Sequence, residues 1–257
     1  MDESIPLRVR QRYALLSFSI FVVVLVAASL YADGYRVRSG HVATTGAINV
    51  YAPISGATVT VDGKEAGKSG LLSHAVYVGD LKPGTHTVSA GADGYLPWQK
   101  SLIVEPKFVS ETSTFLVPLH IEVVPVSAQD IVSVAAFFAT SSLPVHDGGL
   151  ALTLEHGDVI LTWVREQSEA PQVFCIAPSS CAQSFTVKQG GLPASAAAFF
   201  AGGVVYRTSA GVFITEADIK KSRVVAPLYP SSGSDFRIDH RHLYIKDASR
   251  YYEVTNL

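Results

Sequence analysis

The chain has 257 residues and a formal net charge of −2 at pH 7, with 20 basic and 22 acidic side chains that form no concentrated tract of either sign. This balance lacks the basic footprint of nucleic-acid-binding proteins, so we expect no nucleic-acid partner. Roughly 225 residues follow an apolar N-terminal run, enough for two modest domains. Their richness in Val, Ala, Thr and Ser, broken by Gly and Pro, predicts short strands and turns.

The apolar run spans residues 13–32, twenty positions without a charged side chain. A helix of this length is about 30 Å long, which matches the hydrocarbon thickness of a bilayer. Tyr13, Tyr31 and Tyr35 bracket the run, where aromatic rings favour the headgroup region. A buried core helix is the alternative, but such helices rarely lack charge on every face. We therefore predict a transmembrane helix over 13–32, with membrane lipid as its partner.

The charges beside the span predict its orientation. Three arginines precede it and two follow it closely, at positions 8, 10, 12, 36 and 38. Because a short basic N-terminus usually stays inside, we expect a cytoplasmic tail over 1–12 and residues 33–257 outside the cytoplasmic membrane.

A cleaved signal peptide is the alternative to a retained anchor. Its cleavage site would use the small residues of 26–28 or 27–29. Retention is favoured because the apolar run exceeds the roughly 7–15 residues of a signal-peptide core. Both interpretations export the same domain.

Residues 33–119 carry the pattern of a small β-sandwich. Residues 57–61 alternate apolar and polar side chains and lead into Asp62-Gly63, a strong hairpin signal. Further turns are expected at 82–84 and 91–94. Together with strands expected at 46–51, 98–104 and 114–119, this predicts about seven short antiparallel strands.

The same region resembles a PEGA domain, a small β-sandwich of bacterial surface and envelope proteins. The matching positions are Gly46–Val50, Pro53, Gly56, Ala57, Val59, Val61–Lys64, Gly67, Leu81, Pro83, Gly84, His86, Val88 and Gly94–Trp98. The sequence departs from the family where Pro53–Ala57 is one residue longer than the signature Pro-Glu-Gly-Ala and lacks its acid, and where Ser69-Gly70 replaces a Thr-Pro pair. The resemblance implies a surface location and no catalytic residues.

Two aromatic residues of this region, Tyr95 and Trp98, are candidate ligand contacts. An exposed aromatic platform there would suit a glycan or a protein partner. Burial in the sandwich core is the favoured alternative, because large aromatic side chains are mostly buried.

Cys175 and Cys181 are the only cysteines and enclose a Pro-Ser-Ser turn sequence. Outside the cytoplasm such a pair can form a disulfide across a turn, the alternative being two reduced thiols. No Lys, Arg or His lies between them to lower a thiol pKa, so we expect no redox activity.

Residues 120–257 contain an internal similarity that predicts a β-meander. Residues 133–139 and 195–201 share an Ala-Ala-Phe-Phe-Ala sequence, and each copy is followed by Gly-Gly and two apolar runs. A third, partial unit follows at 236–254. The region resembles the propeller-like part that follows PEGA domains in some membrane-anchored bacterial proteins, although three units are fewer than the four blades that propellers usually need.

No nucleotide, hydrolase or metal motif is present. His240 and His242 are expected to share a strand face, but a third metal ligand is not identifiable nearby. An acid/base site would have to bring together residues of two expected turns: His146, Asp147, His156 and Asp158. We expect turn chemistry from these residues, and no catalytic residue, metal or cofactor.

The sequence thus predicts an all-β protein after an N-terminal transmembrane helix, with a PEGA-like sandwich over 33–119 and a propeller-like β module over 120–257. The function predicted is a non-enzymatic cell-envelope protein that serves as a scaffold or binds a cell-wall glycan or surface protein. The alternatives are a degenerate cell-wall hydrolase with a site in the second module and the input subunit of a membrane sensor.

Overall fold

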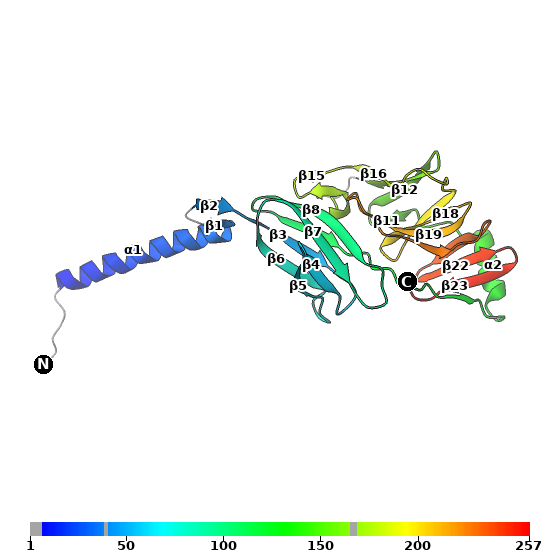
Figure 1. The fold of residues 1–257 in the computed structure, drawn as a ribbon, viewed down its shortest axis with the longest axis horizontal. Coiled ribbons are helices and arrows are strands. Elements are labelled where there is room, and N and C mark those ends of the chain that lie inside the picture. Colours follow the sequence, from blue (N-terminus) through cyan, green and yellow to red (C-terminus); the bar gives the residue numbers. More distant parts are fainter. Residues whose placement is uncertain (1–6, 39–40, 165–168) are drawn as a thin grey trace.

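The computed structural model describes residues 7–38, 41–164 and 169–257, and shows a helical stem attached to a body of β-sheets (Figure 1). Helix α1 (Leu7–Ala32) begins six residues before the predicted start and ends where predicted. An 18-residue window within its segment 9–32 has a mean hydropathy of 2.4 and no buried residue, which excludes the buried core helix. This is the one helix among the described residues that is long and apolar enough to cross a membrane. The first six residues of the expected cytoplasmic tail lie outside the described residues.

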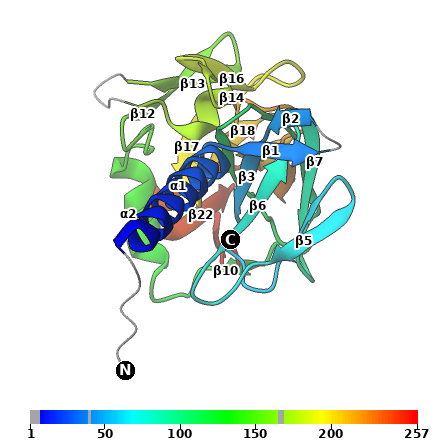
Figure 2. The ribbon, with the colours of Figure 1, turned by 90° about the vertical axis from the view of Figure 1, so that its left-hand side faces the viewer.

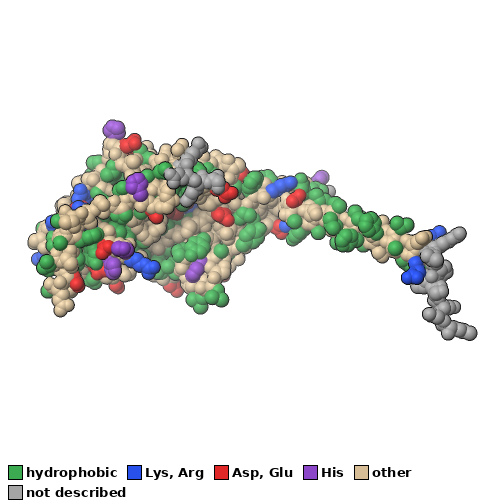
Figure 3. Space-filling view, turned by 180° about the vertical axis from the view of Figure 1, so that it is seen from behind, with side chains coloured by type: hydrophobic (Ala, Val, Ile, Leu, Met, Phe, Trp, Pro, Cys, Tyr) green, Lys and Arg blue, Asp and Glu red, His purple; other side chains and the backbone are tan. Residues whose placement is uncertain are grey.

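The surface of the stem differs from that of the body. Hydrophobic side chains cover the stem along its length, and basic side chains lie near its far end (Figure 3). Seen along the stem, α1 stands in front of the β-sheets and meets them at a small hairpin (Figure 2). The apolar helix therefore projects free of the folded body, as a membrane anchor would.

The sequence analysis did not predict this hairpin, which consists of β1 (Tyr35–Arg38) and β2 (His41–Thr44). Arg36 ties it to the body, because its Nε donates to Asp80 Oδ1 at 2.7 Å. The same guanidinium lies 3.6 Å from the ring centroid of Tyr31, in the last turn of α1. On the other side, Lys107 Nζ lies 4.4 Å from the centroid of the Tyr35 ring. Charged and cation–π contacts thus join the stem to the sandwich.

The first module is a sandwich of two sheets around a shared apolar core. Its strands are β3 (Gly46–Tyr51), β4 (Thr58–Val61), β5 (Lys64–Lys68), β6 (Ala75–Leu81), β7 (Gly84–Gly91), β8 (Trp98–Val104) and β9 (Val109–Ser113). They form a three-stranded sheet in the order β6-β3-β9 and a four-stranded sheet in the order β5-β4-β7-β8. Asp62 and Gly63 both have positive φ, as the predicted tight turn between β4 and β5 requires.

Two expectations for the sandwich were wrong. The sheets are not wholly antiparallel, because β9 runs parallel to β3. The last strand occupies 109–113 instead of 114–119. The apolar side chains of the later segment have another role: Val117 lies in the core of the second module, and Phe115 packs against the cores of both modules. Packing between modules therefore determines the conformation of this segment.

The second module contains three four-stranded antiparallel sheets. The first sheet consists of β11 (His146–Asp147), β12 (Leu150–Glu155), β13 (Asp158–Trp163) and β16 (Ser184–Lys188). The second consists of β17 (Ala196–Phe200), β18 (Gly203–Thr208), β19 (Gly211–Glu216) and β20 (Val225–Tyr229). The third consists of β21 (Asp235–Asp239), β22 (His242–Asp247), β23 (Arg250–Val254) and β10 (Val123–Pro125).

The third sheet joins the two ends of the module. Its outer strand β10 comes from the start of the module and pairs with β23 near the C-terminus. The partial third unit of the sequence thus becomes a four-stranded sheet. Since β10 follows the sandwich directly, this pairing also holds the end of the module near the sandwich (Figure 1).

The β-meander predicted from the two Ala-Ala-Phe-Phe-Ala copies is wrong for the first copy. The first copy lies in helix α2 (Ile131–Thr140), whereas the second forms β17. In α2, Val134 and Phe138 are buried one helical turn apart, and the Phe138 ring lies 5.5 Å from that of Tyr251. In β17, Ala196, Ala198 and Phe200 alternate into an apolar core. The same residues fit either period, so tertiary packing decides between them.

A short segment completes the second module. It consists of the 3-10 helix η1 (Gln172–Phe174) and a hairpin of β14 (Cys175–Ala177) and β15 (Ser180–Cys181). The hairpin carries a disulfide between Cys175 and Cys181. At its tip, the Ser179 amide donates to Glu105 Oε2 of the sandwich at 2.9 Å. This hairpin is therefore one of the contacts between the modules.

Candidate functional site at the junction of the two modules

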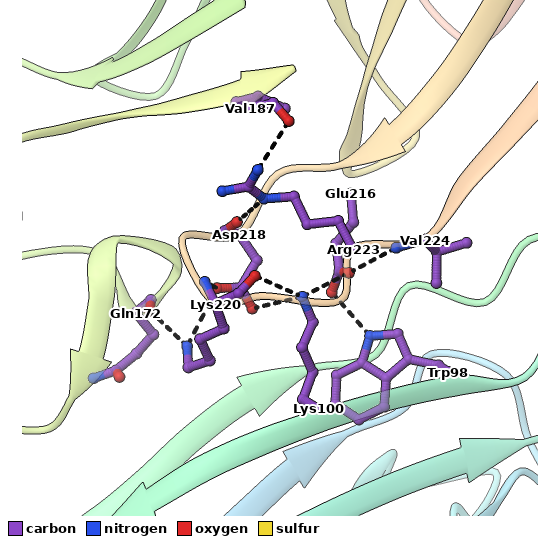
Figure 4. Close-up of polar contacts among 9 residues, drawn as sticks. All are labelled: Trp98, Lys100, Gln172, Val187, Glu216, Asp218, Lys220, Arg223 and Val224. Carbon is purple, nitrogen blue, oxygen red and sulfur yellow. Dashed lines mark hydrogen bonds and ion pairs between the residues drawn. The ribbon is translucent and has the colours of Figure 1, made fainter. Parts of the chain in front are cut away.

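A cluster of buried charged side chains lies where the sandwich meets the second module (Figure 4). Lys100 of β8 is 1% exposed, and its Nζ lies 2.9 Å from Glu216 Oε2 and 3.9 Å from Asp218 Oδ2. Glu216 ends β19, and Asp218 belongs to the loop 217–224 between β19 and β20. Lys100 Nζ also donates to the Lys220 carbonyl oxygen at 3.2 Å. We call Lys100, Glu216, Asp218 and Lys220 the junction cluster.

The alternation of β8 places Lys100 in this position. Trp98, Lys100 and Leu102 all point to the buried face of the strand, whereas Gln99 and Ser101 are exposed. The Trp98 indole Nε1 donates to Glu216 Oε1 at 2.8 Å, so one carboxylate accepts from a tryptophan and pairs with a lysine. Burying such polar and charged groups costs free energy unless each has a hydrogen-bond or ion-pair partner, as these have.

The exposed aromatic platform is wrong for Trp98, and the favoured alternative, burial in the sandwich core, is confirmed for it. Its side chain is 0% exposed and belongs to the sandwich core. Tyr95 is half-buried and forms an isolated bridge with Pro118. The sequence analysis named both aromatics as candidate ligand contacts and favoured their burial; the buried Trp98 indole joins the modules through Glu216.

Two cations and two carboxylates balance the charge within the junction cluster. Lys220 Nζ lies 3.4 Å from Asp218 Oδ1 and donates to the Gln172 carbonyl oxygen at 3.3 Å. Burial raises the pKa of Glu216, and this outweighs the opposing effects of Lys100 and of the hydrogen bond from Trp98. The cluster thus links β8, η1 and the loop 217–224, and fixes one module against the other.

The other side of the same loop faces a groove of about 560 Å³. Tyr206 of β18 and Phe213 of β19 line it with rings stacked 5.7 Å apart at an interplanar angle of 18°. Lys188, Lys221 and Arg223 also line it. We call this hollow the loop groove. It differs from the junction cluster because its lining is aromatic and cationic, and it is open to solvent.

The four candidates for an acid/base site do not converge. His146 and Asp147 lie in β11, opposite Ala151 and Leu150 of β12. His156 and Asp158 lie at the other end of the β12–β13 hairpin, roughly 13 Å further along the strands. Asp158 Oδ1 instead accepts from the Gly190 amide at 2.9 Å.

The expectation that His240 and His242 share a strand face was wrong. His240 has a φ of +52° and lies in the turn between β21 and β22, whereas His242 begins β22. Each ring pairs with a different carboxylate, that of Asp239 or that of Glu253, at 2.6 Å. Within residues 7–38, 41–164 and 169–257, no group of three or more His, Cys, Asp or Glu side chains could hold a metal ion.

Sequence reasoning missed the junction cluster, although one signal was present. A lysine stood on the inward face of a correctly predicted strand, between Trp98 and Leu102. Such a lysine requires a buried acidic partner. Its partners lie about 120 residues away, so no local pattern could identify Glu216 or Asp218.

No protein-family model and no curated protein matches the chain. One similar solved structure is that of a suspected membrane-associated protein of unknown function from Bacteroides fragilis. It shares 11% sequence identity with this chain at a TM-score of 0.23, and the match covers 82% of this chain and 94% of that chain. Likeness at this level carries no argument about function, and the resemblance to PEGA domains stays a prediction.

Proposed function

We propose that the protein is a membrane-anchored, non-enzymatic component of the cell envelope that holds two β modules outside the cytoplasmic membrane as a scaffold or as a binding surface for glycan or protein. The observation that carries the proposal is α1, whose apolar run 13–32 is exposed along its whole length. A soluble protein would expose that surface to water at a large cost in free energy.

Two further features support presentation outside the cytoplasm. The Cys175–Cys181 disulfide suits an oxidising compartment. The arginines at positions 10 and 12 lie at the start of α1, where the positive-inside preference would keep them in the cytoplasm.

The contacts between modules support a scaffold that acts as one unit. The junction cluster, the tip of the disulfide hairpin on Glu105, and Phe115 between the two cores all join the sandwich to the second module. Because these contacts are buried or charge-assisted, we expect the modules to keep a fixed relative orientation.

The hydrolase alternative receives less support. It required His146, Asp147, His156 and Asp158 to meet in one cleft, and they lie at the two ends of a hairpin. A glycan-binding or protein-binding role needs no such convergence.

Membrane extraction tests the anchor. We expect the full chain to stay in the membrane pellet after alkaline carbonate treatment. Val23→Arg places a charge in the middle of the span, which costs about 3 kcal/mol of insertion free energy, and should shift the protein toward the soluble fraction. Val37→Arg is the matched control, because Val37 is 75% exposed in β1, beyond the span. Release of the unchanged full-length chain by carbonate would overturn the proposal.

A further inference from the structure

The loop groove carries a positive charge that its surroundings do not neutralise. Lys188, Lys221 and Arg223 line it, and no Asp or Glu is among the described residues that do so. Lys188 Nζ donates to the carbonyl oxygens of Gly190 and Leu192, at 2.6 Å each. Hydrogen bonds to neutral carbonyl groups leave the lysine charge in place. The groove therefore attracts an anion.

The nearest acids reduce this charge only in part: Asp218 and Glu216 attract Arg223, and Asp158 Oδ1 accepts from the amide of Gly190, which lines the groove. Asp218 and Glu216 lie behind the loop, where Lys100 and Lys220 already match them one for one. Arg223 is bonded to the Asp218 backbone carbonyl, and its Nη1 donates to the Val187 carbonyl at 3.0 Å (Figure 4). These bonds hold the guanidinium in place without pairing it to a carboxylate.

The groove is also lined by two aromatic rings and two threonines. Tyr206 and Phe213 are opposite each other in the β18–β19 pairing and stack with nearly parallel rings. Thr208 and Thr215 also line the groove, and Thr208 Oγ1 accepts from the Ala210 amide at 3.1 Å. Thr215 is 1% exposed, and its Oγ1 has no hydrogen-bond partner among the residues that the structure describes. A sugar ring matches this surface, because it has an apolar C–H face and hydroxyls at its edge.

The position of the groove disfavours an acidic peptide as the ligand. Peptides commonly bind by adding a strand to an open sheet edge. The groove lies over β18 and β19, which have neighbouring strands on both sides in the order β17-β18-β19-β20. Their backbone groups are already used in the sheet, so recognition over these two strands must involve side chains. The edge strands β16 and β20 also line the groove, through Val187, Lys188 and Val225, and the Val187 carbonyl already accepts from Arg223.

We propose that the loop groove binds an anionic oligosaccharide, with Lys221, Arg223 and Lys188 attracting its acidic groups and Phe213 supporting a sugar ring. The volume of about 560 Å³ lies within the range of small-molecule sites. This inference rests on the proposed function, of which it names the ligand class and the site.

The test is calorimetric titration of the full chain in nanodiscs of neutral phosphatidylcholine, with three probes of equal length. The probes are a galacturonic acid hexamer, the neutral maltohexaose and a glutamic acid hexapeptide. We expect the galacturonate hexamer to bind about tenfold or more tightly than the neutral sugar, because hydrogen bonds to charged groups are the stronger ones. We also expect it to bind more tightly than the peptide, which has the charge without the ring.

Two matched variants locate the site. Lys221→Glu reverses an exposed charge in the groove and should weaken galacturonate binding about fivefold or more. Lys68→Glu makes the same change on the exposed strand β5 of the sandwich and should leave binding unchanged. Phe213→Leu should weaken binding of the sugar while leaving the charges in place.

Each contrary result overturns the proposal in a defined way. Equal binding of the neutral sugar removes the requirement for an anion, and equal or tighter binding of the peptide indicates an acidic protein partner. Equal effects of Lys221→Glu and Lys68→Glu indicate non-specific attraction, and absence of binding removes the site. A chain that does not enter nanodiscs overturns the proposed membrane anchor, and the same titrations of the soluble chain still decide the groove.

Discussion

Replacement of Lys100 by Met tests how the two modules are held together. The substitution keeps an unbranched apolar stem and removes the ammonium group that lies 2.9 Å from Glu216 Oε2. Removing one partner of a buried ion pair typically costs about 3–5 kcal/mol, because the other charge remains buried without compensation. We expect Lys100→Met to lower the free energy of unfolding by an amount in this range at pH 8.

The loss should depend on pH. Burial already raises the pKa of Glu216 above its usual 4.5 in the presence of Lys100. Without the lysine, the folded protein should hold a proton on Glu216 at still higher pH. A raised folded-state pKa makes stability fall as pH rises toward that pKa, by up to about 1.4 kcal/mol per pH unit for one group. The difference between the variant and the wild type should therefore be smaller at pH 5 than at pH 8.

Urea unfolding of the full chain in detergent, followed by tryptophan fluorescence, measures this effect. The chain has two tryptophans, and Trp98 donates directly to Glu216, so its emission reports on the junction cluster. Glu216→Gln is the companion variant. It leaves Lys100 near Asp218 Oδ2 at 3.9 Å and should show a smaller and less pH-dependent loss. A loss for Lys100→Met below about 1 kcal/mol, typical of surface ion pairs, or one equal at both pH values would refute the reasoning.

Three further predictions concern stability elsewhere. Hydrogen bonds from the His86 ring and the Thr87 amide lower the pKa of Asp62. Burial lowers the pKa of His86, but its hydrogen bonds to the Lys82 carbonyl and to Asp62 outweigh this effect and raise that pKa. The stability that Asp62 contributes is therefore lost as pH falls below 3.8, and the stability that His86 contributes is lost as pH rises above 6.5. Asp62→Asn should make the Tm depend less on pH between pH 3 and 8, and an unchanged pH profile would contradict this. Cys175→Ser removes a disulfide of sequence separation 6 and should lower the free energy of urea unfolding by about 2 kcal/mol. Reductant should not lower the stability of this variant further, and continued sensitivity to reductant would count against the prediction. Gly203→Ala would place a Cβ 2.6 Å from Phe115 Cζ and 2.7 Å from the Thr215 carbonyl oxygen, and should lower the unfolding free energy by about 1–3 kcal/mol. A neutral result would contradict this close packing.

Local patterns predicted the elements whose conformation is fixed locally. The apolar run 13–32 ends at the same residue as α1, and the strands expected at 46–51 and 98–104 have the bounds of β3 and β8. The Asp62-Gly63 turn also formed as predicted, because Asp and Gly tolerate positive φ. In each case, period and turn chemistry agree with the tertiary structure.

Elements fixed by distant contacts could not be predicted in this way. Residues 133–139 and 195–201 have nearly the same sequence, yet one is helical and the other extended, since Tyr251 packs on the first and β18 pairs with the second. The strand expected at 114–119 was displaced because Val117 is buried in the core of the other module.

The candidate site contains one residue whose position follows from a local pattern and several whose positions depend on distant contacts. The inward position of Lys100 followed from the alternation of its strand, but its partners lie in another module. The loop groove depends on the stacking of Tyr206 on Phe213 across two strands and on cations from the loop 217–224 and from β16. A single sequence does not reveal which strands pair, so the aromatic and cationic residues of the groove could not be grouped beforehand.

Protease accessibility tests the central claim, presentation of the β modules outside the cytoplasmic membrane, most directly. The full chain, with its mass followed through membrane fractionation, would be treated with protease in intact cells and in spheroplasts. We predict a full-length, membrane-bound protein whose β modules are cut only by protease added from outside. If the modules are protected in intact spheroplasts and are cut only after the spheroplasts are lysed, the topology is inverted and the account is contradicted. A shortened soluble species would identify residues 13–32 as a cleaved signal peptide.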